Sequence, residues 1–112
     1  MIDQNNLPDC PVETTLLIIS DRWKVLIIRE LLNGTRRFGK LRKSIDKVSQ
    51  KVLTANLREM EEDGLLTRKV YAEVPPRVEY TLTDFGYSLK PVLDSLCAWG
   101  LQYKDSLKKK QV

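Results

Sequence analysis

The residues best suited to chemistry lie in segment 49–64. Leu53, Leu57 and Met60 recur at helical spacing, which predicts an amphipathic helix with one apolar face. The opposite face begins with short polar or small side chains, namely Ser49, Gln50, Lys51, Thr54 and Ala55. Glutamine pairs with adenine in a bidentate way, threonine and alanine contact the thymine methyl group, and lysine reaches guanine or a phosphate. This face therefore has the chemistry to contact base edges in the major groove of DNA.

The residues around this segment predict how it is positioned. Residues 39–45 predict a short helix, and residues 46–48 predict the turn that follows it. Ser49 is the expected N-cap of the second helix, and Gly64 is expected to end that helix in a left-handed conformation. Two short helices joined by a tight turn form a helix-turn-helix.

A β-hairpin is predicted after the second helix. Residues 65–72 and 78–83 predict two strands of a half-buried sheet with alternating burial, and residues 35–38 can pair with its edge. Arg77, with Pro76 at the hairpin tip, is the candidate for insertion into the minor groove, where the negative potential attracts a guanidinium group. The fold predicted is a winged helix-turn-helix, mainly α with a small β-wing (α+β).

Positive charge is concentrated where these elements begin. Between residues 36 and 51 there are seven basic residues and one acidic residue, although the net charge of the chain is only +4. The candidates for contacts with DNA phosphates are Arg36, Arg37, Lys40, Arg42 and Arg58. A basic run can also be a solvated helix face, but its coincidence with the helix-turn-helix pattern favours a nucleic-acid partner.

Further helices are predicted at both ends of the chain. Pro11 suits the first turn of a helix over about residues 11–20. A second helix covers residues 22–33, and either Ser20 or Asp21 can cap it. The last helix is predicted from residue 84 onward, with a kink at Pro91. It carries an apolar seam at alternating spacings of four and three, formed by Leu89, Leu93, Leu96, Gly100 and Tyr103. The seam predicts an interface between two copies of the chain; the alternative is a terminal helix that packs on its own domain.

The composition argues against an enzyme or a metalloprotein. The chain has no histidine, and its two cysteines, Cys10 and Cys97, are far apart without a CxxC pair, so we expect no metal site. No glycine-rich phosphate loop and no paired acids of an active site are present, so we expect no catalytic residues and no cofactor. Cys97 lies beside the apolar seam and is expected to be buried.

Length and hydropathy predict one cytoplasmic domain. A chain of 112 residues has the size of a single domain, and 42% hydrophobic with 30% charged residues is ordinary for a globular chain. No apolar run approaches the ~18 residues that a membrane span needs, so no membrane partner is expected. The polar, partly acidic start is not a secretory signal.

The chain resembles the HxlR family of bacterial winged helix-turn-helix regulators, which are relatives of the MarR type. The resemblance covers about residues 10–99 and rests on several motifs in order, namely Cys10-Pro11-Val12-Glu13, Arg22-Trp23-Lys24, Arg37-Phe38-Gly39-Lys40-Leu41, Leu53-Thr54-Ala55-Asn56-Leu57-Arg58, Asp63-Gly64-Leu65 and Pro75-Pro76-Arg77-Val78-Glu79-Tyr80-Thr81-Leu82-Thr83. The resemblance implies one domain over residues 1–112, with a DNA-binding core at about 21–83 and dimerisation helices at about 11–20 and 84–108. It also implies a homodimer that represses or activates nearby genes.

The resemblance also implies a role for Cys10. Several family members use the cysteine at this position to sense oxidants, quinones or aldehydes. Pro11 and the start of a helix follow Cys10, so the helix dipole would stabilise its thiolate. The alternative is an unreactive cysteine without a sensing role. The sequence departs from the family at Ser20-Asp21-Arg22, where glycine-rich Gly-Gly-Lys is common.

These observations predict a sequence-specific transcription regulator that binds double-stranded DNA as a homodimer. The expected operator is an inverted repeat with half-sites about one helical turn, ~34–36 Å, apart. A response to oxidants or electrophiles through Cys10 is part of this hypothesis. The alternative function is a winged-helix module that binds protein and not DNA. Steep loss of duplex binding with added salt would separate the two, because phosphate contacts release counterions.

Overall fold

The computed structural model describes residues 2–110 and confirms the predicted fold class. The elements in chain order are α1 (Pro11–Ile18), α2 (Arg22–Leu31), β1 (Arg36–Arg37), α3 (Phe38–Ser44), α4 (Gln50–Glu62), β2 (Leu66–Tyr71), β3 (Arg77–Leu82), α5 (Asp84–Tyr87) and α6 (Lys90–Lys110). Within the described residues the strands form a three-stranded antiparallel sheet in the order β1-β3-β2. The predicted pairing of residues 35–38 with the sheet edge is therefore confirmed.

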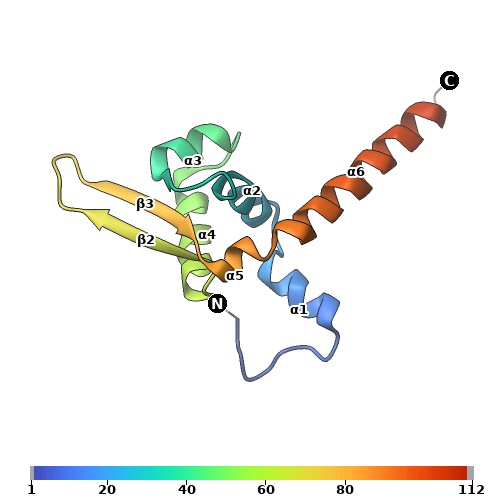
Figure 1. The fold of residues 1–112 in the computed structure, drawn as a ribbon, viewed down its shortest axis with the longest axis horizontal. Helices are drawn as coiled ribbons and strands as arrows, with labels where there is room; N and C mark the ends of the chain where they lie inside the picture. Colours follow the sequence, from blue (N-terminus) through green and yellow to red (C-terminus); the bar gives the residue numbers. More distant parts are fainter. Residues whose placement is uncertain (1, 111–112) are drawn as a thin grey trace.

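The molecule is elongated because two elements project from its body. Helices α2, α3 and α4 pack around the base of the sheet, the β2–β3 hairpin extends to one side, and α6 extends to the other (Figure 1). The principal extents are 57 × 38 × 24 Å and the radius of gyration is 16.2 Å, compared with about 13 Å for a compact chain of similar length. Among residues 2–110, no helix combines the length and the apolar character that crossing a membrane requires.

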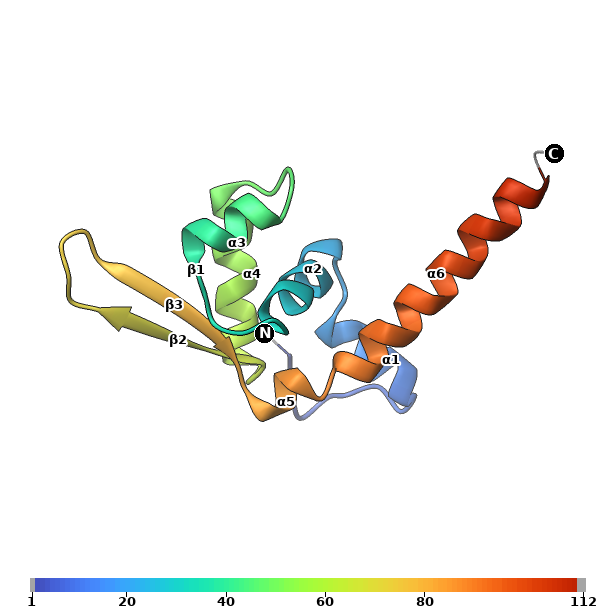
Figure 2. The ribbon, with the colours of Figure 1, turned by 45° about the horizontal axis from the view of Figure 1, so that its top comes forward.

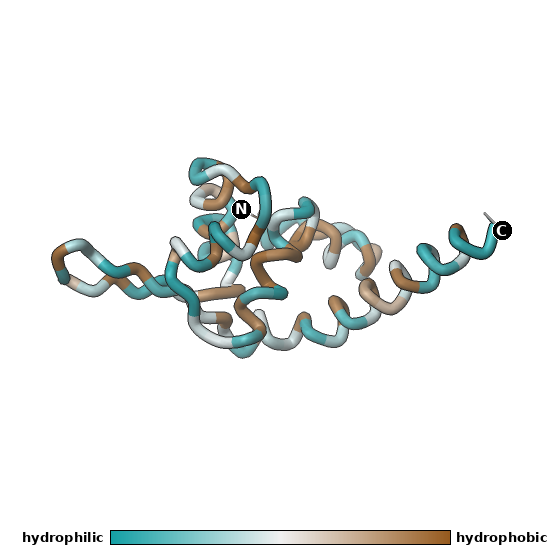
Figure 3. Tube along the Cα trace, turned by 90° about the horizontal axis from the view of Figure 1, so that it is seen from above, coloured by the Kyte–Doolittle hydropathy of each residue, from teal (hydrophilic) through white to brown (hydrophobic). Residues whose placement is uncertain are grey.

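The core lies where α2, α3, α4 and the base of the sheet meet. Its apolar side chains are buried almost completely, and the largest of them are Ile27, Ile28, Leu31, Leu41, Ile45, Leu53, Met60, Leu65 and Leu66. Leu53 and Met60 lie on the face of α4 that helical spacing predicted. Hydrophobic segments gather at the centre of the molecule in Figure 3. Each fully buried aliphatic side chain contributes about 1.5–3 kcal/mol, so this cluster fixes how α4 is mounted.

The predicted caps of α2 and α4 are confirmed, whereas α1 and α2 end two residues earlier than predicted, at Ile18 and Leu31. The Asp21 carboxylate accepts hydrogen bonds from the backbone N–H groups of Trp23 and Lys24, at 2.9 and 3.0 Å, and thereby caps α2. Ser49 caps α4, and Gly64 follows that helix with a φ of 80°. Because these signals involve neighbouring residues only, they could be recognised in the sequence.

The last helical region differs from the prediction. One helix with a kink at Pro91 was expected, but the structure has two helices, α5 and α6, separated by Ser88 and Leu89. Pro91 is the second residue of α6. In the first turn of a helix the missing N–H removes no intrahelical hydrogen bond, so proline is accommodated there without a kink.

The predicted alternation of burial along the strands is wrong for most of the wing. Within β2, which the structure describes in full, only Leu66 is buried, and residues 67–70 are all exposed. In β3, Tyr80 and Leu82 are buried. The hairpin extends beyond the helices (Figure 2), so its outer half lacks the packing partner that alternation presupposes.

One side chain that was expected to be buried is exposed instead, namely Cys97 on α6. The first turn of α6 contacts the core through Val92 and Leu93, but the helix then leaves the body, and Cys97 lies beyond this contact (Figure 1).

Candidate nucleic-acid interface

The outward side of α4 gathers the side chains predicted to contact DNA bases. One shallow hollow on this side is lined by Gln50, Lys51, Thr54, Ala55 and Arg58. Thr54 is half-buried and the other four are exposed. The structure therefore brings these predicted residues together on one surface, with glutamine, lysine and threonine at the N-terminal end of the helix.

Ser49 has a different position from the other predicted base contacts. Its Oγ accepts a hydrogen bond from the backbone N–H of Val52 at 3.1 Å, so the side chain folds back over the first turn of α4. The hydroxyl can still donate one hydrogen bond outward. The structure therefore shows Ser49 as the cap of α4. A contact between Ser49 and a DNA base stays a prediction.

The turn between α3 and α4 orients this surface. Ile45 and Val48 are buried and anchor both ends of the turn in the core. Lys47, between them, adopts a left-handed conformation with φ 69°. A single left-handed residue reverses the chain sharply, and this lets α4 start close to the end of α3.

Three of the predicted phosphate contacts, Arg36, Arg37 and Lys40, lie around the start of α3. Arg36, Arg37, Lys40 and Lys43 line a hollow beside β1 and α3, and Lys43 was not among the predicted contacts. Arg36 is half-buried, and its Nη1 donates to the Thr35 carbonyl oxygen at 3.0 Å. The other four predicted phosphate contacts are exposed, so their side chains can extend into solvent toward a phosphate: Arg37, Lys40, Arg42 and Arg58.

A groove joins α4 to the wing. Gln50, Thr54 and Arg58 line it from the helix, and Arg68 and Val78 line it from the sheet. Arg68 was not among the predicted contacts, because an exposed arginine on a strand has no distinguishing pattern in the sequence. The groove makes the outward side of α4 and one face of the wing a continuous surface.

Arg77 at the wing is engaged within the protein. It is the first residue of β3, and Pro76 precedes it in the exposed loop. Its Nη2 lies 3.2 Å from Glu73 Oε1, and its Nε lies 3.6 Å from Glu79 Oε2. Glu79 therefore pairs with a basic residue of the wing.

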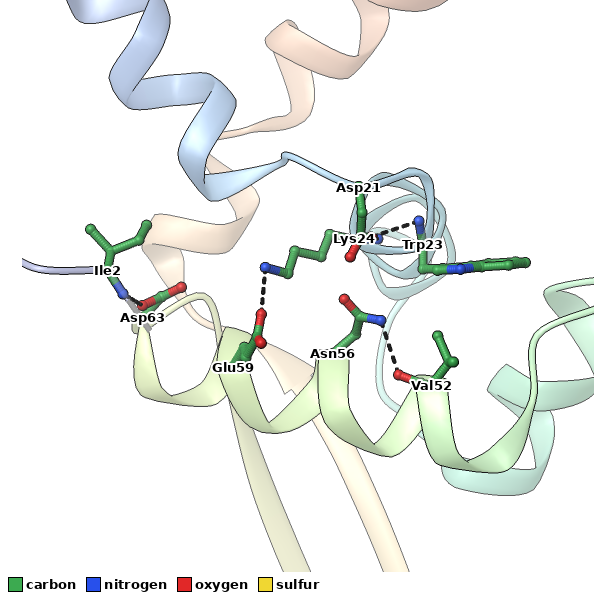
Figure 4. Close-up of polar contacts among 8 residues, drawn as sticks. All are labelled: Ile2, Asp21, Trp23, Lys24, Val52, Asn56, Glu59 and Asp63. Atoms are coloured by element: carbon green, nitrogen blue, oxygen red, sulfur yellow. Dashed lines mark hydrogen bonds and ion pairs between the residues drawn. The ribbon is translucent and has the colours of Figure 1, made fainter. Parts of the chain in front are cut away.

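A polar contact that the sequence did not predict fixes α4 on α2. Lys24 Nζ lies 2.7 Å from Glu59 Oε2, with the Lys24 side chain 7% exposed and that of Glu59 46% exposed (Figure 4). The hydrogen bond from Lys24, followed by the charge of its ammonium group, lowers the pKa of Glu59 from its ordinary value. Next to this pair, the buried Asn56 donates to the Val52 carbonyl oxygen at 2.9 Å.

A weak signal for this contact is present in the sequence. Lys24 continues the apolar stripe of α2 that contains Ile27, Ile28 and Leu31. A lysine on a buried stripe requires a partner, since an unpaired buried charge is costly. The spacing alone does not identify Glu59 as that partner, because the two residues are far apart in sequence.

The predicted dimer residues divide into two groups. Leu89 and Leu93 pack partly buried against the core of their own chain. Leu96 and Tyr103 are 52% and 53% exposed, and Gly100 between them is half-buried. The Tyr103 ring stacks on the neighbouring exposed Trp99, with ring centroids 5.5 Å apart.

Cys10 lies at the start of α1, where the sequence placed it. It is exposed and occupies the N-cap position immediately before Pro11, and its carbonyl oxygen accepts from the Thr14 N–H at 3.2 Å. The thiol is therefore open to reagents in solution.

A helix-turn-helix followed by an antiparallel hairpin defines the winged helix-turn-helix class, and the chain has both parts in this order. Within this class the chain belongs to the HxlR family, because the model of the HxlR-like helix-turn-helix matches residues 18–108. The family resemblance seen in the sequence is thereby confirmed.

Individual relatives agree with this assignment. The HTH-type transcriptional regulator YdeP of Bacillus subtilis (strain 168) is 49% identical over 100 residues, which are 89% of this chain and 78% of YdeP. The redox regulator HypR in its reduced form is similar in structure, with a TM-score of 0.82 at 40% identity, covering 89% of this chain and 99% of that one. The reduced form of the transcriptional regulator YodB from B. subtilis has a TM-score of 0.74 at 36% identity, covering 86% and 95%. The chain is a transcriptional regulator of the helix-turn-helix type.

Proposed function

We propose that the protein binds a specific double-stranded DNA operator through the outward side of α4. The observation that carries this proposal is the division of α4 into two sides. Gln50, Thr54 and Arg58 share an exposed surface, while Leu53 and Leu57 on the opposite side are buried. A helix rigidly mounted in this way offers hydrogen-bonding groups at fixed positions, which direct contact with base edges requires.

The distribution of charge supports DNA over a protein partner. Phe38 at the start of α3, which has the exposed Arg37 and Lys40 close to it in sequence, lines the same groove as Gln50 and Thr54 of α4. Arg58 belongs to both the α4 hollow and this groove toward the wing. Such a surface suits a phosphate backbone on either side of a helix in the major groove. The rival function is a winged-helix module for protein partners.

Salt dependence of duplex binding tests the proposal. The purified protein is titrated with the DNA upstream of its own gene between about 50 and 200 mM salt, where several phosphate contacts cost about 10³-fold in affinity or more. Arg58→Gln should flatten the salt slope by about one unit. Lys109→Gln, which removes one exposed positive charge at the end of α6, is the matched control and should not. Absence of duplex binding at low salt would favour the protein-interaction module.

The proposal includes a homodimer formed by the first and last helices. Exposed apolar side chains on α1 and α6 support it, namely Val12, Leu16, Leu17, Leu96, Trp99, Tyr103 and Leu107. Along both helices, which lie fully within the described residues, no side chain is buried. We therefore assign residues 11–20 and 84–108 to dimerisation and 21–83 to DNA binding. Two copies would position two α4 helices on an inverted repeat, in the cellular compartment that holds the DNA.

We also propose that Cys10 makes the regulator responsive to thiol oxidants. Its exposure at the start of α1 supports this, because a modification there would sit next to the proposed dimer helices. Cys97 is also exposed and provides a matched control. Cys10→Ser should abolish the loss of DNA binding caused by diamide, and Cys97→Ser should retain it. The reverse pattern would assign the response to Cys97.

A further inference from the structure

The outer half of the wing carries a charged network that the proposed function leaves unexplained. In the antiparallel register Tyr71 lies opposite Arg77, and Lys69 lies opposite Glu79. Side chains two residues apart on a strand point to the same face, so these four side chains share one face of the hairpin. The network is therefore part of the wing itself.

Arg77 lies flat along this face. Its Nη2 is 3.2 Å from Glu73 Oε1, its Nε is 3.6 Å from Glu79 Oε2, and its guanidinium carbon is 3.8 Å from the centre of the Tyr71 ring. Its side chain is 26% exposed, and within residues 2–110 its buried Nε has no hydrogen bond. To enter a minor groove, Arg77 must turn outward and give up at least one carboxylate.

The two carboxylates differ in how firmly they are placed. Glu79 is 24% exposed and lies between Lys69 of β2 and Arg37 of β1 in the sheet register. Glu73 lies outside the strands, in the loop next to the wing tip, and is 50% exposed. Glu73 is therefore the partner that Arg77 leaves first.

We propose that Glu73 is a specificity-determining residue of the wing, and this inference rests on the proposed DNA-binding function. The Glu73 carboxylate competes with the minor groove for Arg77. A narrow A·T-rich groove has an enhanced negative potential and attracts arginine most strongly. On other duplexes Arg77 stays with Glu73, so the ion pair is broken only in the complex with A·T-rich flanks. Because the cost of breaking the pair arises only in that complex, Glu73 lowers affinity for A·T-rich flanks most and thereby moderates the preference for them.

Binding to two duplexes that differ only in their flanks tests the role of Glu73. Both contain the DNA upstream of the gene, with either A·T-rich or G·C-rich flanking steps where the wing would lie. Glu73→Gln should tighten binding to the A·T-rich duplex by about two- to fivefold, the range of an exposed ion pair, and change binding to the G·C-rich duplex by less. Glu62→Gln removes the same charge from the exposed end of α4. As the control, it should leave the ratio of the two affinities unchanged.

Arg77 provides the decisive comparison. In an Arg77→Ala background, Glu73→Gln should lose its effect on the flank preference, because the residue with which Glu73 competes is gone. Equal tightening with and without Arg77 would reduce Glu73 to a general repulsive charge and overturn the inference. If the wild type binds the duplexes but Glu73→Gln binds them equally well or more weakly, the inference about Glu73 is also overturned. Failure of the wild type to bind any duplex would overturn the proposed function and this inference together.

Discussion

The ion pair between Lys24 and Glu59 gives the most direct prediction about how α4 is mounted. Glu59→Gln removes the charge that faces a lysine side chain of which only 7% is exposed. Breaking a fully buried pair costs about 3–5 kcal/mol, whereas an exposed pair contributes about 0.2–1 kcal/mol. Because the Glu59 side chain is 46% exposed, solvent screens the pair, and we expect an intermediate loss of about 1–2 kcal/mol.

Thermal unfolding at fixed protein concentration measures this loss. For a chain of this size, 1–2 kcal/mol corresponds to a decrease in Tm of roughly 4–15 °C. The control is Asp94→Asn, which breaks the pair between Lys90 and Asp94 at 2.8 Å, where both side chains are nearly two-thirds exposed. It should cost at most about 0.5 kcal/mol. Equal Tm values for the two variants would refute the structural role of the Lys24–Glu59 pair.

The pH dependence supplies a second check on the same pair. The pKa of Glu59 in the folded protein is lowered from its ordinary value of 4.5. A lowered pKa means that the pair stabilises the fold at pH values above 4.5 and that this contribution disappears as the pH falls through the folded value. The stability difference between wild type and Glu59→Gln should therefore be full at pH 7 and shrink in acid. A difference that stays constant down to about pH 3 would contradict an electrostatic origin.

Other substitutions test separate parts of the structure. Gly86→Ala places a Cβ in contact with the Leu65 carbonyl oxygen and should lower stability by about 1–3 kcal/mol; unchanged denaturant unfolding would contradict this close approach. Asp21→Ala removes the cap of α2 and should cost about 0.5–2 kcal/mol in the same assay, so a neutral result would exclude a stabilising cap. Trp99→Ser removes an exposed aromatic from α6 and should shift sedimentation toward the monomer without loss of helical signal; an unchanged sedimentation coefficient would place the dimer contact elsewhere.

Local patterns predicted most of the fold. The two sides of α4, the caps at Asp21 and Ser49 and the left-handed Gly64 depend on residues within a few positions of one another. Spacing and side-chain type determine such features, so the sequence contains their full signal. The grouping of Gln50, Lys51, Thr54 and Ala55 on the outward side of α4 could be predicted for the same reason.

Features that depend on tertiary neighbours were predicted poorly. The partner of Lys24 is in another helix, and Arg77 is paired within a hairpin whose register the sequence did not specify. Alternation in β2 presupposed a covering element, yet the outer wing projects from the body. Cys97 was expected to be buried because its seam is apolar, but an apolar seam can face a second copy as well as the core.

Contact between Gln50 and a DNA base tests the central claim most directly. After the operator has been located by footprinting, wild type and Gln50→Ala are titrated with duplexes that each carry one substituted base pair. Alanine is favourable in a helix, so α4 should remain intact. For the wild type, loss of a good base contact should cost about 1–3 kcal/mol at the base pair that Gln50 contacts in each half-site. The variant should become indifferent to that base pair and keep its non-specific affinity. A variant with the wild-type preference at every base pair would contradict base recognition by this side of α4.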